Sequence, residues 1–196
     1  MSVDPALSRR PLHLELGCGS SKRSADSVGI DLIEAPGVDI VGDALSVLRD
    51  LDDGSVASVY SQHFLEHLDD PLALVTEATR VLAPGGVFEA VVPHFSNPAY
   101  YSDPTHRTPF GLYTFSYWVR STPFTRRVPH YIDPLPLDLV SARLVFKSHR
   151  PFYVRHALKK ATSAWVNAST WTQELYEEHL CWLMPCYEVH YVLRRA

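Results

Sequence analysis

The sequence contains few cysteines and no long apolar segment. Three cysteines among 196 residues are an odd and sparse set, which argues against a disulfide framework and for a reducing compartment. No apolar run approaches the roughly 20 residues of a membrane span, and the first residues lack the order of a signal peptide. We therefore expect a cytoplasmic protein with no membrane partner.

An excess of positive charge is also lacking. The net charge is -4, which gives no electrostatic reason to expect nucleic acid as a partner. Apolar residues make up 46% of the chain and charged residues 20%, as in soluble globular proteins, and no repeat or low-complexity segment occurs. The length suits one domain, so we expect residues 1–196 to form a single domain.

Short strand patterns follow one another through the first half of the chain. The predicted strands are residues 12–16, 27–32, 38–41, 55–61 and 87–93. Before the fifth of them, Asp69 or Asp70 caps a helix that has Pro71 in its first turn and ends at Pro84-Gly85-Gly86. Strands that alternate with loops and helices predict an α/β fold, a mostly parallel sheet with helices on both faces.

The second half contains two segments that interrupt this plan. Residues 94–136 are rich in proline and aromatic side chains, and we predict that they form a lid or acceptor-binding insertion. Residues 140–149 have the pattern of a sixth strand. Residues 152–184 predict a helical insertion, and residues 186–195 predict the last strand.

The string from Glu15 to Gly19 is the most informative in the chain. Gly17 and Gly19 allow a sharp turn after the first strand and a close approach of the backbone to a ligand. A dinucleotide site would have a third glycine where Lys22 stands, and the carboxylate of Glu15 would repel a pyrophosphate. That carboxylate can instead hold an ammonium group, which S-adenosylmethionine carries. The pattern favours the sulfonium cofactor over NAD.

Acids follow the next two predicted strands at positions that suit a nucleoside. Asp31 can accept hydrogen bonds from ribose hydroxyls, and Asp43-Ala44 suit the amine of adenine. Gln62-His63-Phe64 follow the fourth strand and would line the cofactor. The same acids could instead cap the following turns. The candidate cofactor residues are Glu15, Gly17, Cys18, Gly19, Lys22, Asp31, Leu32, Asp43, Ala44, His63 and Phe64.

These motifs, in this order, resemble those of class I S-adenosylmethionine-dependent methyltransferases. The resemblance covers roughly residues 12–95 and rests on the string at Glu15, on Asp31, on Asp43-Ala44, on His63 to Leu68 and on the helix that ends at Gly86. It implies a Rossmann-like sheet whose last strand is antiparallel. It also implies a methyltransferase with S-adenosylmethionine as its cofactor.

The first crossover departs from the usual length. Gly19 and Asp31 are 12 positions apart, against about 20 in dinucleotide folds, so the first helix is short or replaced by a loop. GCGSSK before a short segment, with SDPTHR at residues 102–107, resembles a subset associated with sugar or polysaccharide methylation. That subset includes enzymes that methylate mycobacterial mannose polysaccharides. The resemblance implies O-methylation of a sugar or oligosaccharide hydroxyl, of mannoside type, in polysaccharide biosynthesis.

An alcohol acceptor is a poor nucleophile until its proton is removed, and several residues could act as the base or hold a metal that assists. The candidate catalytic residues are His106, His94, His67 and Asp103. A divalent metal such as Mg²⁺, held by some of His94, Asp103, His106 and His130, would serve the same end. Because their spacing matches no metal motif, we assign no metal ligands. Each of these side chains could also simply pin the loop through hydrogen bonds.

Aromatic residues of the insertion have two interpretations. Tyr100, Tyr101, Phe110, Tyr113, Phe115, Tyr117 and Trp118 could form a sugar-stacking wall or the core of the insertion, and a mixture is favoured. Farther along, Trp165 and Trp171 would pack on the sheet or on a second subunit, so a homodimer is one expected partner state.

Three alternatives to sugar O-methylation stay open. The same sheet could carry a nicotinamide dehydrogenase, although the chain lacks an obvious hydride site. A non-catalytic relative that only binds cofactor is the second. Methylation of a nitrogen or a carboxyl group is the third. Asn97-Pro98-Ala99-Tyr100 is near in spelling to a nitrogen-acceptor motif but follows the fifth strand instead of the fourth, so we attach no meaning to it.

Overall fold

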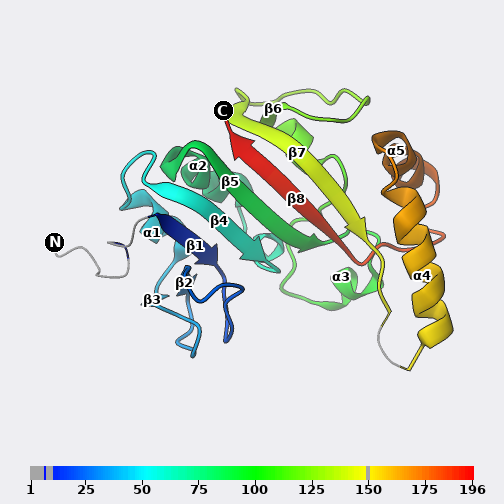
Figure 1. Cartoon of the computed structure of the whole chain (residues 1–196), viewed down its shortest axis with the longest axis horizontal. Helices are drawn as coiled ribbons and strands as arrows, with labels where there is room; N and C mark the ends of the chain where they lie inside the picture. Colours follow the sequence, from blue (N-terminus) through cyan, green and yellow to red (C-terminus); the bar gives the residue numbers. More distant parts are fainter. Residues whose placement is uncertain (1–6, 8–10, 149–150) are drawn as a thin grey trace.

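One eight-stranded sheet runs through this computed structural model, which describes residues 7, 11–148 and 151–196 (Figure 1). The strands are β1 Leu12–Leu16, β2 Val28–Asp31, β3 Ile40–Val41, β4 Val56–Gln62, β5 Leu82–Pro93, β6 Val119–Ser121, β7 Leu135–Val145 and β8 Glu188–Arg195. The α-helices are α1 Ala44–Arg49, α2 Pro71–Val81, α3 Pro98–Ser102, α4 Tyr153–Val166 and α5 Thr170–His179, with 3-10 turns η2 Leu65–His67 and η3 Thr114–Tyr117.

The order of the strands is β3-β2-β1-β4-β5-β8-β7-β6. Strands β1 to β5 pair in parallel, whereas β8 lies antiparallel between β5 and β7. The predicted Rossmann-like sheet with an antiparallel last strand is confirmed. In such a sheet the carboxyl ends of the parallel strands form one edge, and ligands bind beyond that edge.

One face of the sheet carries the hydrophobic core. Side chains that alternate along the central strands, among them Val59, Phe88 and Tyr191, are fully buried there. The apolar side of α2 covers them, and Phe115 from η3 lies 4.7 Å from Tyr191 between ring centroids. Asp70 caps α2 through the amide of Ala73, and Pro71 occupies its first turn, as predicted.

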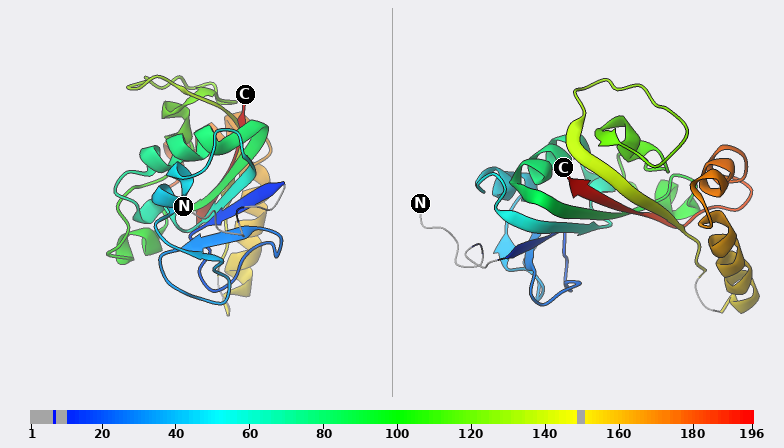
Figure 2. Two further views of the ribbon diagram at one scale, coloured as in Figure 1. Left: turned by 90° about the vertical axis from the view of Figure 1, so that its left-hand side faces the viewer. Right: turned by 45° about the horizontal axis from the view of Figure 1, so that its top comes forward.

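On the opposite face, the connection from β1 to β2 contains no helix. The prediction that helices cover both faces of the sheet is therefore confirmed only in part. Residues 17–27 join β1 to β2 as a loop, because so few residues cannot form a helix and both of its connections. In the right-hand view of Figure 2, α2 and η3 lie above the sheet and the loops of the first strands hang below it. Arg23 partly replaces the missing helix, with its guanidinium 4.5 Å from the ring of Tyr60 and 2.6 Å from Glu89.

The two segments that interrupt the plan do so in different ways. Residues 94–136 contain α3, η3 and β6, and residues 152–184 contain α4 and α5, which stand beyond the end of the sheet farthest from β1 to β3 (Figure 1). The sixth predicted strand, 140–149, corresponds to β7, which begins earlier and ends at Val145; residue 149 lies outside the described residues. The short elements α1, α3 and β6 were not predicted.

Candidate functional site

The turn after β1 depends on glycine at its first position. Gly17 has a φ of +65°, and a Cβ atom there would lie 2.6 Å from Cγ of Phe64. Gly19 has a φ of +55° with open space around it, and its amide donates to Oδ2 of Asp31 at 2.9 Å. The turn thus joins the carboxyl ends of β1, β2 and β4, with the backbone of Gly17 against an aromatic ring.

The candidate nucleoside residues lie along the carboxyl edge of β2 and β3. Asp31 accepts from the amides of Gly19 and Ile33, one on each carboxylate oxygen, which leaves lone pairs for two hydroxyls. Leu32 and Ile33 are 68% and 74% exposed, an apolar pair beside the acid that an adenine ring would cover. Asp43 caps α1, and its side-chain Oδ1 accepts from both the amide and the hydroxyl of Ser46.

Glu15 and Lys22 hold the first crossover loop. The carboxylate of Glu15 is buried and accepts from the amide of Arg23 on both oxygens at 2.9 Å and from the hydroxyl of Ser27 at 3.2 Å. Lys22 pairs with Asp39 at 2.6 Å. The sequence suggested that Glu15 holds an ammonium group, whereas its contacts here are all within the loop.

Cys18 is buried within this turn and does not have the environment of a reactive thiol. Burial, with Asp31 next in effect, raises the pKa of Cys18 above its ordinary value. Its sulfur lies 3.5 Å from the carbonyl of Gly37. Cys18 therefore fills space under the turn, and its place among the candidate cofactor residues stays a prediction. Ala44, in the first turn of α1, is also buried.

His63 follows β4 and adopts a φ of +51°, a conformation that is costly for a residue with a side chain. Its Nε2 lies 3.3 Å from Oε2 of Glu188, and its Nδ1 lies 3.4 Å from Oε1 of Glu66. The neighbouring carboxylates of Glu188 and then Glu66 outweigh burial and raise the pKa of His63 to about 9. The imidazole is thus a cation at neutral pH, held between two carboxylates.

A polar cavity of about 290 Å³ opens at the carboxyl ends of β4 and β5. It is lined by His63, Glu66, His67, Pro93, Asn97, Ala99, Tyr100, Asp103, His106 and Tyr187. Three of the four candidate catalytic residues therefore meet here, together with His63 of the cofactor set. Glu66, which no sequence argument assigned, is fully buried in the wall.

Hydrogen bonds fix the other two histidines of this cavity. His67 Nδ1 lies 2.8 Å from Oγ1 of Thr105, whose hydroxyl donates to Oδ1 of Asp103 at 2.6 Å. His106 Nδ1 donates to the carbonyl of Tyr100 at 2.9 Å, and its ring stacks on that of Tyr100. Bonds from the hydroxyl and amide of Thr105 lower the pKa of Asp103.

His94 lies elsewhere. It is fully buried, with Nε2 at 2.8 Å from Oε2 of Glu177 and Nδ1 at 2.8 Å from the hydroxyl of Ser96. Glu177 also accepts from the amide of Leu112, so this pair ties α5 to the insertion. His130 is exposed, with Nδ1 at 3.3 Å from the carbonyl of Tyr117. The four residues considered as metal ligands thus separate, and only Asp103 and His106 line the polar cavity.

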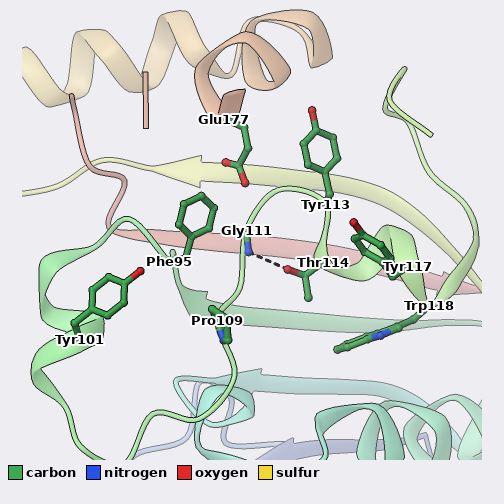
Figure 3. Close-up of a pocket in the computed structure, with 9 residues that line it drawn as sticks. All are labelled: Phe95, Tyr101, Pro109, Gly111, Tyr113, Thr114, Tyr117, Trp118 and Glu177. Atoms are coloured by element: carbon green, nitrogen blue, oxygen red, sulfur yellow. Dashed lines mark hydrogen bonds between the residues drawn. The ribbon is translucent and has the colours of Figure 1, made fainter. Parts of the chain in front are cut away.

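A second cavity, of about 520 Å³, is aromatic (Figure 3). Its lining is Phe95, Tyr101, Pro109, Gly111, Tyr113, Thr114, Tyr117, Trp118 and Glu177. All of these except Glu177 belong to residues 94–136. Figure 3 shows Phe95 and Tyr101 on one side of Gly111, and Tyr117 and Trp118 on the other. Because Tyr100, Phe110 and Phe115 are buried, the aromatic series is a mixture of cavity wall and core.

Comparisons with known proteins agree with this arrangement. Residues 14–90 match a family model described as a methyltransferase domain. A structure of an S-adenosylmethionine-dependent methyltransferase from Archaeoglobus fulgidus has a TM-score of 0.60 at 16% identity, over 97% of this chain and 88% of that one. Geranyl diphosphate C-methyltransferase from Streptomyces coelicolor has a TM-score of 0.53 at 14% identity, over 95% and 73%. No curated protein sequence matches the chain.

Identities this low establish the fold alone, a Rossmann-like α/β methyltransferase fold. The family match is limited to residues 14–90, and the Archaeoglobus fulgidus neighbour is described as dependent on S-adenosylmethionine. The residues fit that cofactor, because the glycine turn, the partly free carboxylate of Asp31 and the exposed apolar pair Leu32-Ile33 lie along one edge. No helix of the described residues has the length and apolar character needed to cross a membrane.

Proposed function

We propose that this protein transfers a methyl group from S-adenosylmethionine to a hydroxyl of a sugar or oligosaccharide. The observation that carries the proposal is the position of the polar cavity. Its wall includes His63, next to Phe64, whose ring would meet a side chain placed at Gly17. A cofactor seated on the glycine turn would therefore have its reactive end near a cavity of imidazoles and carboxylates, which suits a hydroxylated acceptor.

Residues at the carboxyl edge would hold the cofactor through separate groups. Backbone at Gly17 and Gly19 would face its amino-acid part, Asp31 its ribose, and Leu32 with Asp43 its adenine. When bound, S-adenosylmethionine supplies a methyl group made electrophilic by the sulfonium. Glu15 and Lys22 act indirectly in this assignment, because their contacts shape the loop that carries the turn.

His67 and His106 are the residues that we assign to activation of the acceptor. Each uses its Nδ1 in a hydrogen bond, so the Nε2 of the neutral ring is available to the cavity. A bare imidazole nitrogen activates a hydroxyl either by accepting its proton or by holding a cation that acidifies it. Asp103 orients His67 through Thr105. His94 is left out, because both of its nitrogens are engaged inside the core.

Residues 94–136 supply the acceptor side of this site. They contribute half of the residues that line the polar cavity and all but one of those that line the aromatic cavity. The aromatic cavity offers the flat surfaces on which the CH faces of a sugar ring can stack. We assign this segment as the acceptor-binding insertion. A mannoside acceptor and a role in polysaccharide biosynthesis rest on the resemblance of GCGSSK, before a short segment, and of SDPTHR to the sugar-modifying subset of these enzymes. The buried, free cysteines Cys18, Cys181 and Cys186 support a cytoplasmic location.

Calorimetry with S-adenosylmethionine, and separately with NAD, tests the cofactor assignment. We expect micromolar binding of S-adenosylmethionine, about -8 kcal/mol, that weakens at least about tenfold in Asp31→Ala. Asp26→Ala, an exposed acid in the same part of the chain, is the matched control and should bind as the wild type does. Binding of NAD in place of S-adenosylmethionine would contradict the assignment and support a dehydrogenase.

A panel of acceptors tests the second half of the proposal. Methylmannosides, other oligosaccharides, amines and carboxylic acids are incubated with the protein and S-adenosylmethionine, and S-adenosylhomocysteine is quantified. Mass spectrometry of the product should locate the methyl group on a sugar oxygen. Turnover with an amine or a carboxylic acid alone would contradict O-methylation. Tight cofactor binding with no turnover of any acceptor would support a non-catalytic relative.

A further inference from the structure

Glu66 is a buried carboxylate without a hydrogen bond. The residue has 0% exposure, and neither carboxylate oxygen accepts a hydrogen bond from any described residue. The nearby basic atoms are Nδ1 of His63 at 3.4 Å and Nε2 of His67 at 3.9 Å. A buried charge with so few partners is costly unless a cation compensates it. His63 compensates part of the charge of Glu66, and a further cation near the carboxylate would compensate the rest.

Two imidazoles face this carboxylate. Glu66, His67 and His106 each bring one ligand atom within 4.8 Å of the other two. The hydroxyl of Thr105 donates to Asp103, so Thr105 must accept from Nδ1–H of His67; the carbonyl of Tyr100 likewise requires Nδ1–H on His106. The neutral form of each ring therefore has its lone pair on Nε2. A hydrogen bond on the other ring nitrogen is the usual setting of a metal-binding histidine.

Backbone hydrogen bonds hold together the two segments that carry Glu66 and His106. The carbonyl of Glu66 accepts from the amide of Arg107 at 2.7 Å and from that of Thr108 at 3.2 Å. The turn η2 is thereby fastened to the segment that carries His106. Asp103 adds a carboxylate 3.7 Å from Nε2 of His106. The carboxylate and the two imidazoles are thus positioned by contacts that do not themselves use the ligand atoms.

We propose that Glu66, His67 and His106 bind a divalent first-row transition metal ion. Two imidazoles and one carboxylate suit zinc, cobalt or manganese better than Mg²⁺, which prefers oxygen ligands. Tetrahedral ligand atoms around zinc lie about 3.4 Å apart, so binding would draw the three side chains together. The ion lies in the polar cavity, where it would bind an acceptor oxygen and lower the pKa of its hydroxyl.

Cobalt titration of untagged, metal-stripped protein tests the site without any methyl-transfer substrate. We expect visible d–d absorption that saturates at one Co²⁺ per chain and is displaced by Zn²⁺. Glu66→Gln, His67→Ala and His106→Gln should each weaken binding by about 100-fold, and Thr105→Val, which removes the hydroxyl that links His67 to Asp103, by about tenfold. His179→Ala, at an exposed histidine, should bind as the wild type does.

The result separates metal binding from the proposed methyl transfer. Absence of saturable Co²⁺ binding by the wild type overturns the site, even if the protein binds S-adenosylmethionine. Equal affinity in the wild type and in all three ligand variants also overturns it. Circular dichroism and the thermal midpoint of each variant show whether it is folded. If Glu66→Gln is unfolded, the two histidine variants decide.

Discussion

Gly17 shows how one backbone position links the cofactor turn to the end of β4. Its φ of +65° is unfavourable for other residues, and the ring of Phe64 occupies the place that a Cβ atom would need. Both effects come from the same position, so strain and steric overlap add. Gly19, two residues later, has the left-handed conformation but open space around it. Comparing substitutions at Gly17 and Gly19 therefore separates the cost of backbone strain from the cost of steric overlap with Phe64.

We expect Gly17→Ala to lower the free energy of unfolding by about 3 kcal/mol, from left-handed strain and overpacking together. Gly19→Ala should lower it by about 1 kcal/mol, from strain alone. Urea unfolding followed by fluorescence gives both values. Gly17→Ala should also weaken S-adenosylmethionine binding, because Phe64 must move away from the turn. Equal losses of stability in the two variants would contradict the contact with Phe64.

Glu188 is the residue through which acid should weaken this end of the sheet. It is buried, and burial alone would raise the pKa of its carboxyl. Hydrogen bonds from His190, His63 and Lys147 outweigh burial and lower that pKa below the ordinary value of 4.5. A carboxyl with a lowered pKa in the folded state stabilises the fold above its unfolded pKa and loses that contribution as the pH falls.

Glu188→Gln should therefore cost about 1–3 kcal/mol at neutral pH and progressively less below a pH of about 4.5. The measurement is the difference in unfolding free energy between wild type and variant at several pH values. Glu89→Gln, which removes an exposed ion pair with Arg23, is the control and should cost less than about 1 kcal/mol. A difference for Glu188→Gln that stays constant down to pH values of about 3 would contradict the ionised cluster.

At the scale of elements, side-chain contacts hold the first crossover loop on the sheet, in place of the packing that a crossover helix would provide. Glu15 holds the loop from below, and Arg23 extends across the sheet to Tyr60. The cofactor turn forms the beginning of this loop, so its shape depends on contacts that never reach the ligand. A loop held by hydrogen bonds is easier to release than a packed helix.

We expect Glu15→Ala to lower the free energy of unfolding by about 1–3 kcal/mol, because the amide of Arg23 loses its acceptor in a buried place. The same change should weaken S-adenosylmethionine binding and expose residues 17–27 to proteolysis. Arg23→Ala is the comparison, since it keeps the backbone contact and removes only the half-exposed ion pair with Glu89 and the contact with the ring of Tyr60. If Arg23→Ala proved as damaging as Glu15→Ala, the loop would depend on its surface cover instead.

At the scale of the whole molecule, the parts that could be predicted are those with local causes. The glycine turn, the alternation of strands and helices along the chain and the cap at Asp70 each depend on a few neighbouring residues. The polar cavity depends on distant ones, because the amide of Arg107 bonds to Glu66, and His94 is buried by Glu177, 83 residues later. Glu66 has no local signal beyond its place beside His67. Elements as short as α1 are too brief to show a period.

The helix α4 gives the molecule an unpartnered surface. Val154, Leu158 and Trp165 recur at helical spacing on it and are 77%, 62% and 45% exposed. The helix also carries Arg155, Lys159 and Lys160 and no carboxylate, whereas the chain as a whole has a net charge of -4. A basic apolar helix on an acidic molecule is complementary to a second copy of that molecule. We therefore expect a homodimer in which α4 is covered.

Light scattering after size exclusion, at several protein concentrations, measures that state directly. The wild type should have the mass of a dimer, and Leu158→Glu should have that of a monomer with its fold retained, because a carboxylate in the contact is desolvated without a partner. Val140→Glu changes an exposed apolar residue of β7 and should leave the dimer intact. A monomeric wild type at tens of micromolar would contradict the dimer. Equal dissociation by both variants would place the contact away from α4.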